Sequence, residues 1–256
     1  MINLKINPKK ETERIVQFIQ TTLKEQKFKK IIISLSGGID STTVLYLAQK
    51  ALPKENILIV NFSHLEDYRF DLNIVNKLNI PKENVFFIPV KNIVADFNKK
   101  LENNLKNYQD RLRLGNLISR IRMIFLFDLA KKYRALVCGT ENRSEKLLGY
   151  YTRFGDQASD FEPISHLYKT QVKQLARYLK VPEEIINKTP TAGLWPGQTD
   201  EDELGFSYQE ADKVFCLYCD KKMTVEQITK RGFAKAKKII TRYKQNRFKE
   251  LAPYHL

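Results

Sequence analysis

Short runs of almost uninterrupted apolar residues alternate along the chain with longer segments in which apolar residues recur at helical spacing. Four such runs predict β-strands, at residues 30–35, 56–62, 84–90 and 135–139. Helices are predicted at residues 11–25, 41–51, 67–78, 116–133, 169–179 and 234–247. Strands that are apolar on both faces and are separated by helices predict an α/β fold, a doubly wound parallel sheet with helices on both faces.

Length and charge narrow the picture further. No Gly-, Ser- or Pro-rich stretch divides the 256 residues, so the expectation is a single domain over residues 1–256. The formal net charge of +15 favours a phosphate-bearing partner, without choosing between a nucleotide and a nucleic acid. Much of the excess lies in residues 221–249, where Glu226 is the single acid. A solvated basic helix face explains this concentration at least as well as a binding surface.

The cysteines and the apolar segments bear on the compartment. The chain has three cysteines, no charged-then-apolar leader and no uninterrupted apolar span of about 18 residues, which predicts a cytoplasmic protein without a membrane segment. Cys216 and Cys219 have the spacing of half a zinc knuckle, but no second pair or suitably spaced His completes it. The two thiols are therefore interpreted as structural.

The string SGGIDS, residues 36–41, joins the first predicted strand to the helix that follows it. Gly37 and Gly38 allow positive φ and a close backbone approach, so that successive N–H groups can point at one anion. Ser36 and Ser41 add hydroxyl groups, and the helix N-terminus adds its positive dipole end. The pattern predicts a phosphate cradle at the carboxyl end of the strand, where parallel sheets bind their ligands.

Asp40 complicates the phosphate cradle. A tight strand-to-helix connection capped by Asp40 and Ser41 is the purely structural alternative. No Gly-x4-Gly-Lys-Ser/Thr motif occurs, so the Lys of a Walker loop is absent. Asp40 would repel phosphate unless a cation lies between them, which suggests Mg²⁺. Residues 137–172 add further groups that suit two nucleotides and a metal: Thr140, Glu145, Tyr150, Tyr151, Asp156, Asp160 and Lys169.

Residues 36–41 resemble the PP-loop of the N-type ATP pyrophosphatases, which cleave ATP between the α- and β-phosphates. Four further strings extend the resemblance: GNLISRIRM (115–123), GTENRSEKLLGYYTRFGD (139–156), PISHLYKTQV (163–172) and KTPTAGLWPGQTDEDELGFSY (188–208). Together these motifs resemble those of the ammonia-dependent NAD+ synthetases over roughly the whole chain. The resemblance implies a Rossmann-like fold of the adenine nucleotide alpha hydrolase type.

The resemblance also implies a reaction. ATP, deamido-NAD+ and ammonia would give AMP, diphosphate and NAD+, the last step of NAD+ biosynthesis. In this family the carboxylate of deamido-NAD+ attacks the α-phosphorus of ATP, and ammonia then displaces AMP from the adenylated intermediate. Catalysis would rest on positioning and charge neutralisation, without a nucleophile from the protein.

Individual roles follow from position within the matching motifs. The resemblance assigns ATP binding to Ser34, Leu35, Ser36, Gly37, Gly38, Ile39, Asp40, Ser41, Thr140, Lys169 and Thr191. It assigns contacts with deamido-NAD+ to Arg120, Tyr150, Tyr151, Arg153, Asp160 and Lys249. The implied Mg²⁺ ligands are Asp40 and Glu145. The implied catalytic residues are Asp40, Lys169 and Asp156, of which Asp156 would accept a proton from ammonium, since only neutral ammonia is nucleophilic.

Several positions have a structural alternative or depart from the family pattern. Arg120 lies in an apolar helical stretch and would also serve as a structural side chain, and Asp156 would also suit a turn. Arg153 stands where the family commonly has Lys. Residues 248–250 replace a His-Lys-Arg run, so only Lys249 is carried over. The segment after the second predicted strand matches no family pattern, which leaves the adenine pocket unassigned.

Partners complete the expectation. The resemblance implies a homodimer, with no nucleic acid or membrane partner. Free ammonia is the expected amide donor, because glutamine-dependent relatives carry an amidohydrolase domain for which this chain lacks the length; a separate glutaminase is the alternative. A tRNA-modifying PP-loop enzyme is the rival function, favoured by the basic C-terminal third. A nucleotide-binding stress protein is a non-enzymatic alternative, which would leave the paired carboxylates Asp40 and Glu145 unexplained.

Overall fold

The computed structural model describes residues 2–63, 72–101, 107–195 and 197–250. Within them, four parallel strands form one sheet in the order β3-β2-β1-β4. The strands are β1 (Lys30–Ser34), β2 (Ile57–Ser63), β3 (Val85–Pro89) and β4 (Ala135–Val137). The register places Ile33 opposite Ile59 and Ile31 opposite Leu136. The predicted parallel α/β sheet is therefore confirmed.

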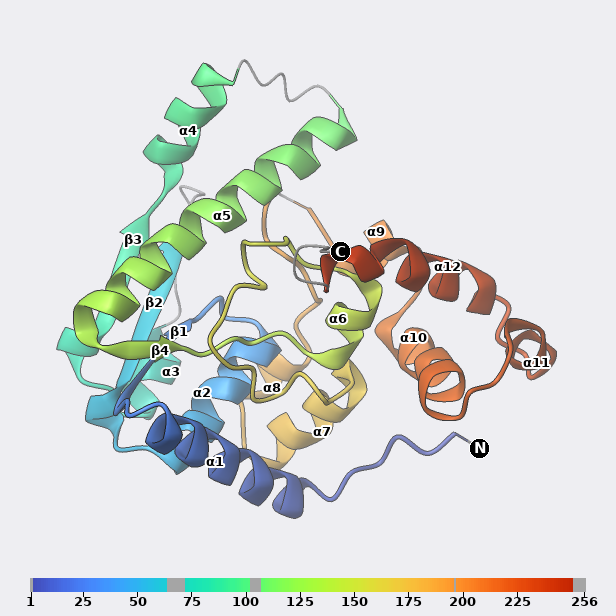
Figure 1. Ribbon diagram of the computed structural model, residues 1–256, viewed down its shortest axis with the longest axis horizontal. Coiled ribbons are helices and arrows are strands. Elements are labelled where there is room, and N and C mark those ends of the chain that lie inside the picture. Colours follow the sequence, from blue (N-terminus) through green and yellow to red (C-terminus); the bar gives the residue numbers. More distant parts are fainter. Residues whose placement is uncertain (1, 64–71, 102–106, 196, 251–256) are drawn as a thin grey trace, which may run out of the picture.

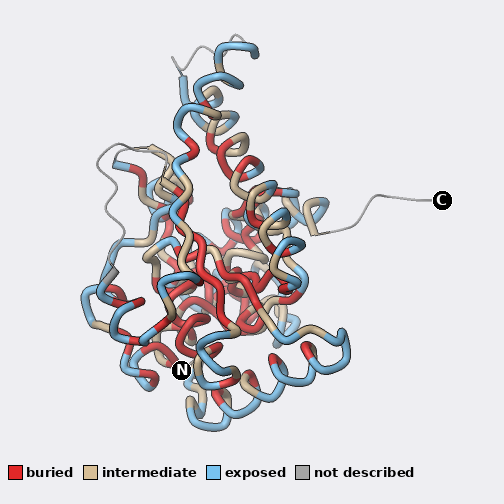
Figure 2. Tube along the Cα trace, turned by 90° about the vertical axis from the view of Figure 1, so that its left-hand side faces the viewer, coloured by how far each residue is buried: buried red, intermediate tan, exposed pale blue. Residues whose placement is uncertain are grey.

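Helices cover both faces of this sheet. One face carries α1 (Pro8–Glu25), α2 (Ile39–Ala51) and α7 (Lys169–Tyr178), and the other carries α4 (Lys91–Lys100) and α5 (Tyr108–Tyr133). Successive side chains of β1 point to opposite faces. Ile31 and Ile33 are buried against α1, α2 and α7, whereas Ile32 is buried against α5. In Figure 2 the buried segments gather at the centre of the molecule, and β1, β2 and β4 are largely buried whereas β3 is more exposed.

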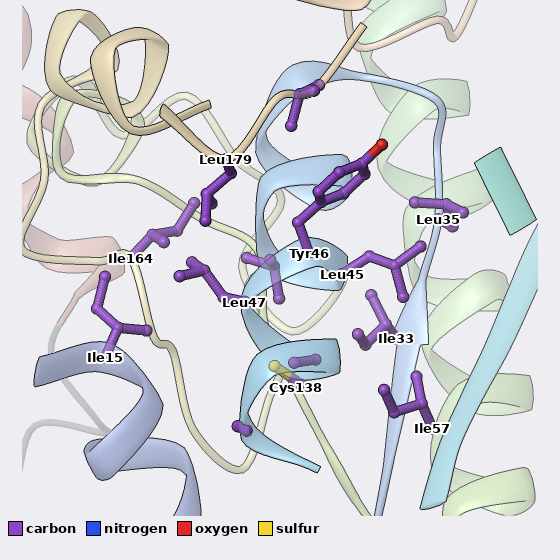
Figure 3. Close-up of a cluster of buried hydrophobic side chains, with 14 of the residues drawn as sticks. Ile15, Ile33, Leu35, Leu45, Tyr46, Leu47, Ile57, Cys138, Ile164 and Leu179 are labelled. Carbon is purple, nitrogen blue, oxygen red and sulfur yellow. The ribbon is translucent and has the colours of Figure 1, made fainter. Parts of the chain in front are cut away.

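Helix α2 is buried on nearly all sides, which fixes the turn that precedes it. Figure 3 shows Leu45 close to Ile33 and Leu35 on one side of α2 and Leu47 directed toward Ile15 and Ile164 on the other. Leu45 and Leu47 are fully buried. Each such side chain contributes about 1.5–3 kcal/mol through burial. The N-terminus of α2 is thereby held rigidly over the carboxyl end of β1.

The remaining helices extend the fold beyond the sheet. They are α3 (Leu72–Lys77), α6 (Arg143–Leu148), α8 (Glu183–Ile186), α9 (Asp200–Leu204), α10 (Tyr208–Phe215), α11 (Val225–Lys230) and α12 (Ala236–Asn246). Short 3₁₀ turns occupy Lys54–Asn56, Lys82–Asn84 and Arg247–Lys249, and a π-helical turn occupies Cys216–Asp220. None of the described helices is both long and apolar enough to cross a membrane.

Four of these helices, α6, α10, α11 and α12, form a second apolar cluster beside the sheet. Its centre contains Leu148, Phe215 and Ile239, each fully buried. Cys216 is buried in this cluster, and Cys219 packs against it, both as free thiols. This packing supports the structural interpretation of the two cysteines.

Most predicted helices are confirmed, with shifted ends. The predictions at residues 11–25, 41–51, 169–179 and 234–247 correspond to α1, α2, α7 and α12. Helix α1 begins earlier, because Asn7 caps it and Pro8 occupies its first turn. Helix α5 begins at Tyr108 rather than at the predicted residue 116, because the Asn107 side chain accepts a hydrogen bond from the Asp110 N–H at 2.9 Å. The predicted helix at residues 67–78 lies partly outside the described residues, and α3 is its described part.

Two local differences concern the segment after β4. The strand ends at Val137 rather than at residue 139. The Cys138 N–H still donates to the Ile32 carbonyl of β1 at 3.0 Å, and the Gly139 N–H, on the other side, donates to the Phe161 carbonyl at 2.8 Å. Helix α6 follows where no helix is predicted. It begins at a capping box in which the Asn142 side chain accepts from the Ser144 and Glu145 N–H groups.

Gly149 is a point of close approach between α6 and α12. It has a φ of 59°, and a Cβ at this position would lie 2.3 Å from the Cβ of Asn246. We expect Gly149→Ala to lower the free energy of unfolding by roughly 2–4 kcal/mol, because left-handed strain adds to overpacking. Urea unfolding measures this loss. Gly193→Ala is the matched control, since Gly193 has a φ of 61° and nothing within 4 Å of an added Cβ. Equal losses in both variants would contradict a contribution from the contact with Asn246.

Candidate active site

A cleft of about 650 Å³ opens beyond the carboxyl ends of β1 and β4. In the order β3-β2-β1-β4 the strand order reverses between these two strands, and open α/β sheets bind ligands at this point. The turn after β1, the segment after β4, one side of α5, residues 188–194 and the end of α12 supply the lining. The sheet topology thus brings together groups that are far apart in the sequence.

The turn between β1 and α2 has the geometry of an anion cradle. Gly37 has a φ of 73°, a left-handed conformation that favours glycine. The hydroxyl oxygens of Ser36 and Ser41 lie 3.1 Å apart. The Ser36 N–H donates to the Ser41 hydroxyl and the Gly38 N–H donates to the Ser36 hydroxyl, both at 3.3 Å. Two hydroxyls and two N–H groups therefore converge at the N-terminus of α2, and the binding of phosphate there stays a prediction.

A buried lysine joins the two carboxylates that the resemblance assigns to a metal. Lys169 begins α7 and is 3% exposed. Its Nζ lies 2.5 Å from Oδ2 of Asp40 and 3.0 Å from Oε1 of Glu145. Asn142 binds the other oxygens, because its Nδ2 donates to Oδ1 of Asp40 at 2.9 Å and its backbone N–H donates to Oε2 of Glu145 at 3.3 Å. One ammonium and one amide residue thus hold together carboxylates from α2 and α6.

Burial shapes the protonation of this group. Desolvation raises the pKa of Glu145 to about 8, an effect that Lys169 opposes and Asp40 reinforces. Desolvation lowers the pKa of Lys169, but the Asp40 and Glu145 carboxylates outweigh it and raise this pKa above its ordinary value. Lys169 therefore carries its charge at neutral pH, and a cation beside Glu145 favours the ionised form of that side chain.

A buried network fixes Lys169 relative to Glu145. Asp212 of α10 is fully buried and accepts hydrogen bonds from the Ser144 hydroxyl and from the Thr170 N–H, the latter at 2.9 Å. The Ser144 hydroxyl oxygen accepts in turn from the Lys169 N–H at 2.8 Å. These bonds tie the first turns of α6 and α7 to α10. Asp212 is thus a positioning residue for the site.

A third carboxylate, that of Asp200, lines the same cleft as Lys169. Asp200 is 4% exposed, and its Oδ2 accepts a hydrogen bond from the Tyr208 hydroxyl at 3.0 Å. The Lys169 Nζ lies 5.1 Å from the centroid of the Tyr208 ring. Sequence reasoning assigned no role in the site to Asp200, Tyr208 or Asn142. Only Asn142 carried a local signal, since the Asn-x-x-Glu capping pattern places it directly beside Glu145.

Most residues that the resemblance assigns to substrates lie together in the cleft. Its lining includes Ser34, Leu35, Ser36, Gly38, Ile39, Asp40, Ser41, Thr140, Glu145, Tyr150, Tyr151, Asp156, Lys169, Thr191 and Lys249, with Gly37 in the same turn. The Lys249 Nζ donates to the carbonyl oxygens of Gly149 at 2.7 Å and Tyr151 at 3.2 Å. Asp156 is exposed and accepts a hydrogen bond from the Thr152 N–H at 2.9 Å. It therefore also has the role in a turn that was the structural alternative for this residue.

Three residues assigned to deamido-NAD+ lie outside the lining of the cleft. The exposed Arg120 donates from Nε and Nη2 to the Arg153 carbonyl oxygen, both at 3.3 Å. The Arg153 guanidinium lies 4.8 Å from the centre of the Phe154 ring. Asp160 is exposed and accepts a hydrogen bond from the Val137 N–H at 2.7 Å. Their assignment to the dinucleotide stays a prediction.

Part of the lining of the cleft is apolar. Leu35, Phe62, Met123 and Leu126 line the cleft between the carboxyl ends of β1 and β2 and helix α5. Asn61 stands beside them, with its Nδ2 donating to the Leu35 carbonyl oxygen at 2.8 Å. Flat apolar walls with a few polar groups are typical of sites for aromatic ligands. Phe62 belongs to the region that no family pattern covers in the sequence.

A parallel sheet, a double-glycine turn at a helix N-terminus and paired carboxylates beside it define a nucleotide-binding protein of the PP-loop class with a Rossmann-like fold. The family model described as NAD synthase matches residues 11–253, and the chain belongs to this family. The predicted family is thus confirmed. Because NAD synthetases are ligases, the predicted enzyme class is confirmed as well.

Curated relatives agree with the family assignment. The NH(3)-dependent NAD(+) synthetase of Thermococcus sibiricus is 44% identical over 219 residues, which cover 85% of this chain and 84% of the relative. The protein of the same name from Fusobacterium nucleatum is 38% identical over 257 residues, which cover 99% of this chain and 97% of the relative. The tRNA-modifying and non-enzymatic alternatives receive no support from these matches.

Solved structures agree with the fold. The NMN synthetase of Francisella tularensis superposes with a TM-score of 0.83 at 30% identity, over 98% of this chain and 99% of that one. The NH3-dependent NAD synthetase of Campylobacter jejuni, in complex with the nitrate ion, gives a TM-score of 0.79 at 31% identity, over 98% of this chain and 100% of that one. The fold of the entire chain is therefore shared with proteins of this family.

Proposed function

We propose that the chain is an ammonia-dependent NAD+ synthetase, which converts ATP, deamido-NAD+ and ammonia to AMP, diphosphate and NAD+. One observation carries the proposal: the double-glycine turn and the Asp40–Lys169–Glu145 group share one cleft, in a chain of the NAD synthase family. A cradle for phosphates next to paired carboxylates suits the cleavage of ATP at its α-phosphorus.

The phosphates of ATP are proposed to lie on the turn between β1 and α2. The N–H groups and hydroxyls of Ser36 and Ser41 would bind phosphate oxygens, and the N-terminus of α2 would add its positive dipole end. Lys169 would add a point charge, since its pKa is raised. Thr140 and Thr191 line the same cleft and would complete the polar contacts.

Asp40 and Glu145 fit a magnesium ion. Both are hard oxygen donors, and both already converge on one cationic atom, the Lys169 Nζ. Within the described part of the chain no group of three or more His, Cys, Asp or Glu side chains is arranged around a metal position. One or two carboxylates together with substrate phosphates are the usual ligands of Mg²⁺. When bound, the ion supplies neutralisation of the charge that develops on the leaving diphosphate.

The second half of the reaction would take place beside Tyr150, Tyr151 and Asp156. The aromatic side chains suit the pyridine ring, and Asp156 would accept the proton that ammonium must lose. A homodimer, which the family resemblance implies, would bring the surface of Arg120, Arg153 and Asp160 next to the dinucleotide. No nucleic acid or membrane takes part in the proposed reaction, which is expected in the cytoplasm.

Release of diphosphate and AMP from ATP tests the proposal. With Mg²⁺ and ammonium present, AMP release is expected to require deamido-NAD+ and to match NAD+ formation mole for mole. Glutamine in place of ammonium serves as the control for the amide donor and is expected to give no NAD+. ATP cleavage that depends on tRNA rather than on deamido-NAD+ would contradict the assignment.

Because the fold is similar to that of an NMN synthetase, the same assay should also compare a mononucleotide substrate with deamido-NAD+. Nicotinic acid mononucleotide is supplied in place of deamido-NAD+. The dinucleotide is expected to give the higher kcat/KM, in line with the NAD+ synthetases that match most of this chain. A higher kcat/KM for the mononucleotide would overturn the substrate and leave the ligase chemistry intact.

A further inference from the structure

Glu141 is a buried carboxyl group that the proposed reaction does not use. It follows Thr140 in the segment after β4, is 7% exposed and lines the cleft. Both of its carboxyl oxygens are buried and have no hydrogen-bond partner among the described residues. Buried polar groups in folded proteins are almost always hydrogen-bonded, and an exception calls for an occupant or a function.

The neighbouring cations are engaged elsewhere. The Lys146 Nζ binds Oε2 of Glu162 at 2.7 Å, and the Lys249 Nζ binds the Gly149 and Tyr151 carbonyl oxygens. Neither forms an ion pair with Glu141 within the described residues. Burial raises the pKa of Glu141, and the nearby Glu162 carboxylate adds to this shift. Lys146 opposes this shift in pKa without forming an ion pair, so no cation is bound directly to Glu141 among the described residues.

Tyr151 presents a second unpartnered group in the same place. It is 8% exposed, lines the cleft, and its hydroxyl is likewise buried without a partner in the described part of the chain. Glu141 is the foremost charge acting on this hydroxyl, where it adds to the rise in pKa that burial causes. The two side chains, named the recess, thus contribute carboxyl and phenol oxygens without partners among the described residues to the lining of the same cleft.

The chemistry of this recess selects its occupant. The carboxyl oxygens of Glu141 lack a donor, and the Tyr151 phenol oxygen can accept as well, so a hydrogen-bond donor suits them. Glu162, Glu145 and Asp156 act on Glu141 against one cation, Lys146, so the surrounding charge is mainly negative and favours a small cation over an anion. Ammonium has four N–H donors and no acceptor. It is also the ionised form of the substrate that Asp156, on the same cleft, is proposed to deprotonate.

We infer that Glu141 and Tyr151 form the ammonium-binding recess of the enzyme, which holds the ion by hydrogen bonds until it gives its proton to Asp156. The inference rests on the proposed function. It assigns binding of the nitrogen substrate to residues distinct from the acceptor of its proton. Adenylation of deamido-NAD+, which precedes the use of ammonia, does not involve Glu141.

Kinetics separate the two steps. Exchange of labelled diphosphate into ATP, with deamido-NAD+ and Mg²⁺ but no ammonium, reports adenylation alone. In Glu141→Gln this exchange is expected to be unchanged. In NAD+ formation, the KM for ammonium is expected to rise ~10- to 100-fold in Glu141→Gln, as the loss of a hydrogen bond to a charged group implies. The KM values for ATP and deamido-NAD+ should stay the same.

Glu162→Gln is the matched control, since Glu162 is a neighbouring carboxylate already paired with Lys146. Its KM for ammonium should change little. An unchanged KM for ammonium in Glu141→Gln, an equal rise in Glu162→Gln, or loss of exchange in Glu141→Gln would each overturn the recess. Absence of exchange in the unmodified protein would refute the proposed function instead. In that case ammonium binding is tested by the melting temperature in ammonium chloride, compared with sodium chloride. Ammonium is expected to raise the melting temperature of the unmodified protein but not that of Glu141→Gln.

Discussion

Asp40→Asn and Glu145→Gln are expected to lower the rate of deamido-NAD+-dependent ATP cleavage by about 10²–10³-fold, the range found when a preorganised electrostatic contact is removed from an active site. Both replacements keep the size of the side chain and remove its charge. Asp40 would lose its ion pair with Lys169 at 2.5 Å, and Glu145 would lose its ion pair at 3.0 Å. The rate of diphosphate exchange into ATP measures the effect.

The fold is expected to survive these two substitutions. Asn142 remains able to cap α6, because its side chain accepts from backbone N–H groups that neither variant alters. Glu210→Gln is a matched control, since this acid of α10 has a distant partner, Lys235, at 3.8 Å. Circular dichroism should be identical in the three variants. Full activity in both Asp40→Asn and Glu145→Gln would refute their role in metal and phosphate binding.

Lys169→Met is expected to abolish adenylation and to lower the free energy of unfolding by about 3–5 kcal/mol, the usual loss when one partner of a buried ion pair is removed. Asp40 and Glu145 would then face each other without a cation. The control is Lys146→Met, because the Lys146 side chain is 35% exposed and its pair with Glu162 is partly solvated. This control should lose about 0–1 kcal/mol. Urea unfolding of both variants measures the difference.

The loss in Lys169→Met is expected to depend on pH. With Lys169 present, the pKa of Glu145 is about 8, above its value in an unfolded chain, and Lys169 is the group that lowers it. Removal of Lys169 raises the pKa of Glu145 further. Above about pH 8 the folded variant therefore keeps a proton on Glu145 that the unfolded chain has released. The variant should therefore lose more stability relative to the unmodified protein as pH rises above about 8. A pH-independent difference would contradict this coupling.

Mg²⁺ alone should stabilise the Lys169→Met variant more than the unmodified protein. In the variant the ion would no longer compete with a tethered ammonium for the two carboxylates. Any ligand that binds only the folded state raises its stability in proportion to the logarithm of the ligand concentration. Melting temperatures with and without Mg²⁺, in the absence of nucleotide, provide the measurement. An equal response of both proteins would show that Lys169 does not occupy the position of the metal.

The strand, the glycine turn and the helix that follows it could be predicted because their signal is local. The apolar strand, the two glycines and the helix after them are contiguous in the sequence, and each has one ready structural reading. Gly37 adopts the left-handed conformation that the pattern implies. The family motifs supplied Lys169 and Glu145, which the structure brings to Asp40 across long sequence separations.

The other residues of the site could not be predicted from the spacing of apolar residues in the sequence. Helix α6 spans only Arg143–Leu148, too short for an apolar repeat, and its capping box is the single local signal. Asp200 and Tyr208 acquire their places because α9 and α10 pack beside α7, and composition does not encode that packing. Glu141 looks like an ordinary surface acid in the sequence. Only its burial and its lack of a partner distinguish it.

The position of Lys169 also bears on the order in which substrates enter. In the protein without nucleotide its single ammonium pairs with both acids, so Asp40 and Glu145 share one positive charge. A free magnesium ion would have to displace the Lys169 ammonium, which would then have no anionic partner. Free ATP could pair with Lys169 only if Lys169 left Asp40 and Glu145, and the two acids would then repel the phosphates. If the magnesium ion and ATP arrived as one complex, Asp40 and Glu145 would hold the metal and Lys169 would pair with phosphate, so that each charge would have a partner. On the proposed function, the lysine would therefore favour the magnesium complex of ATP over either component alone.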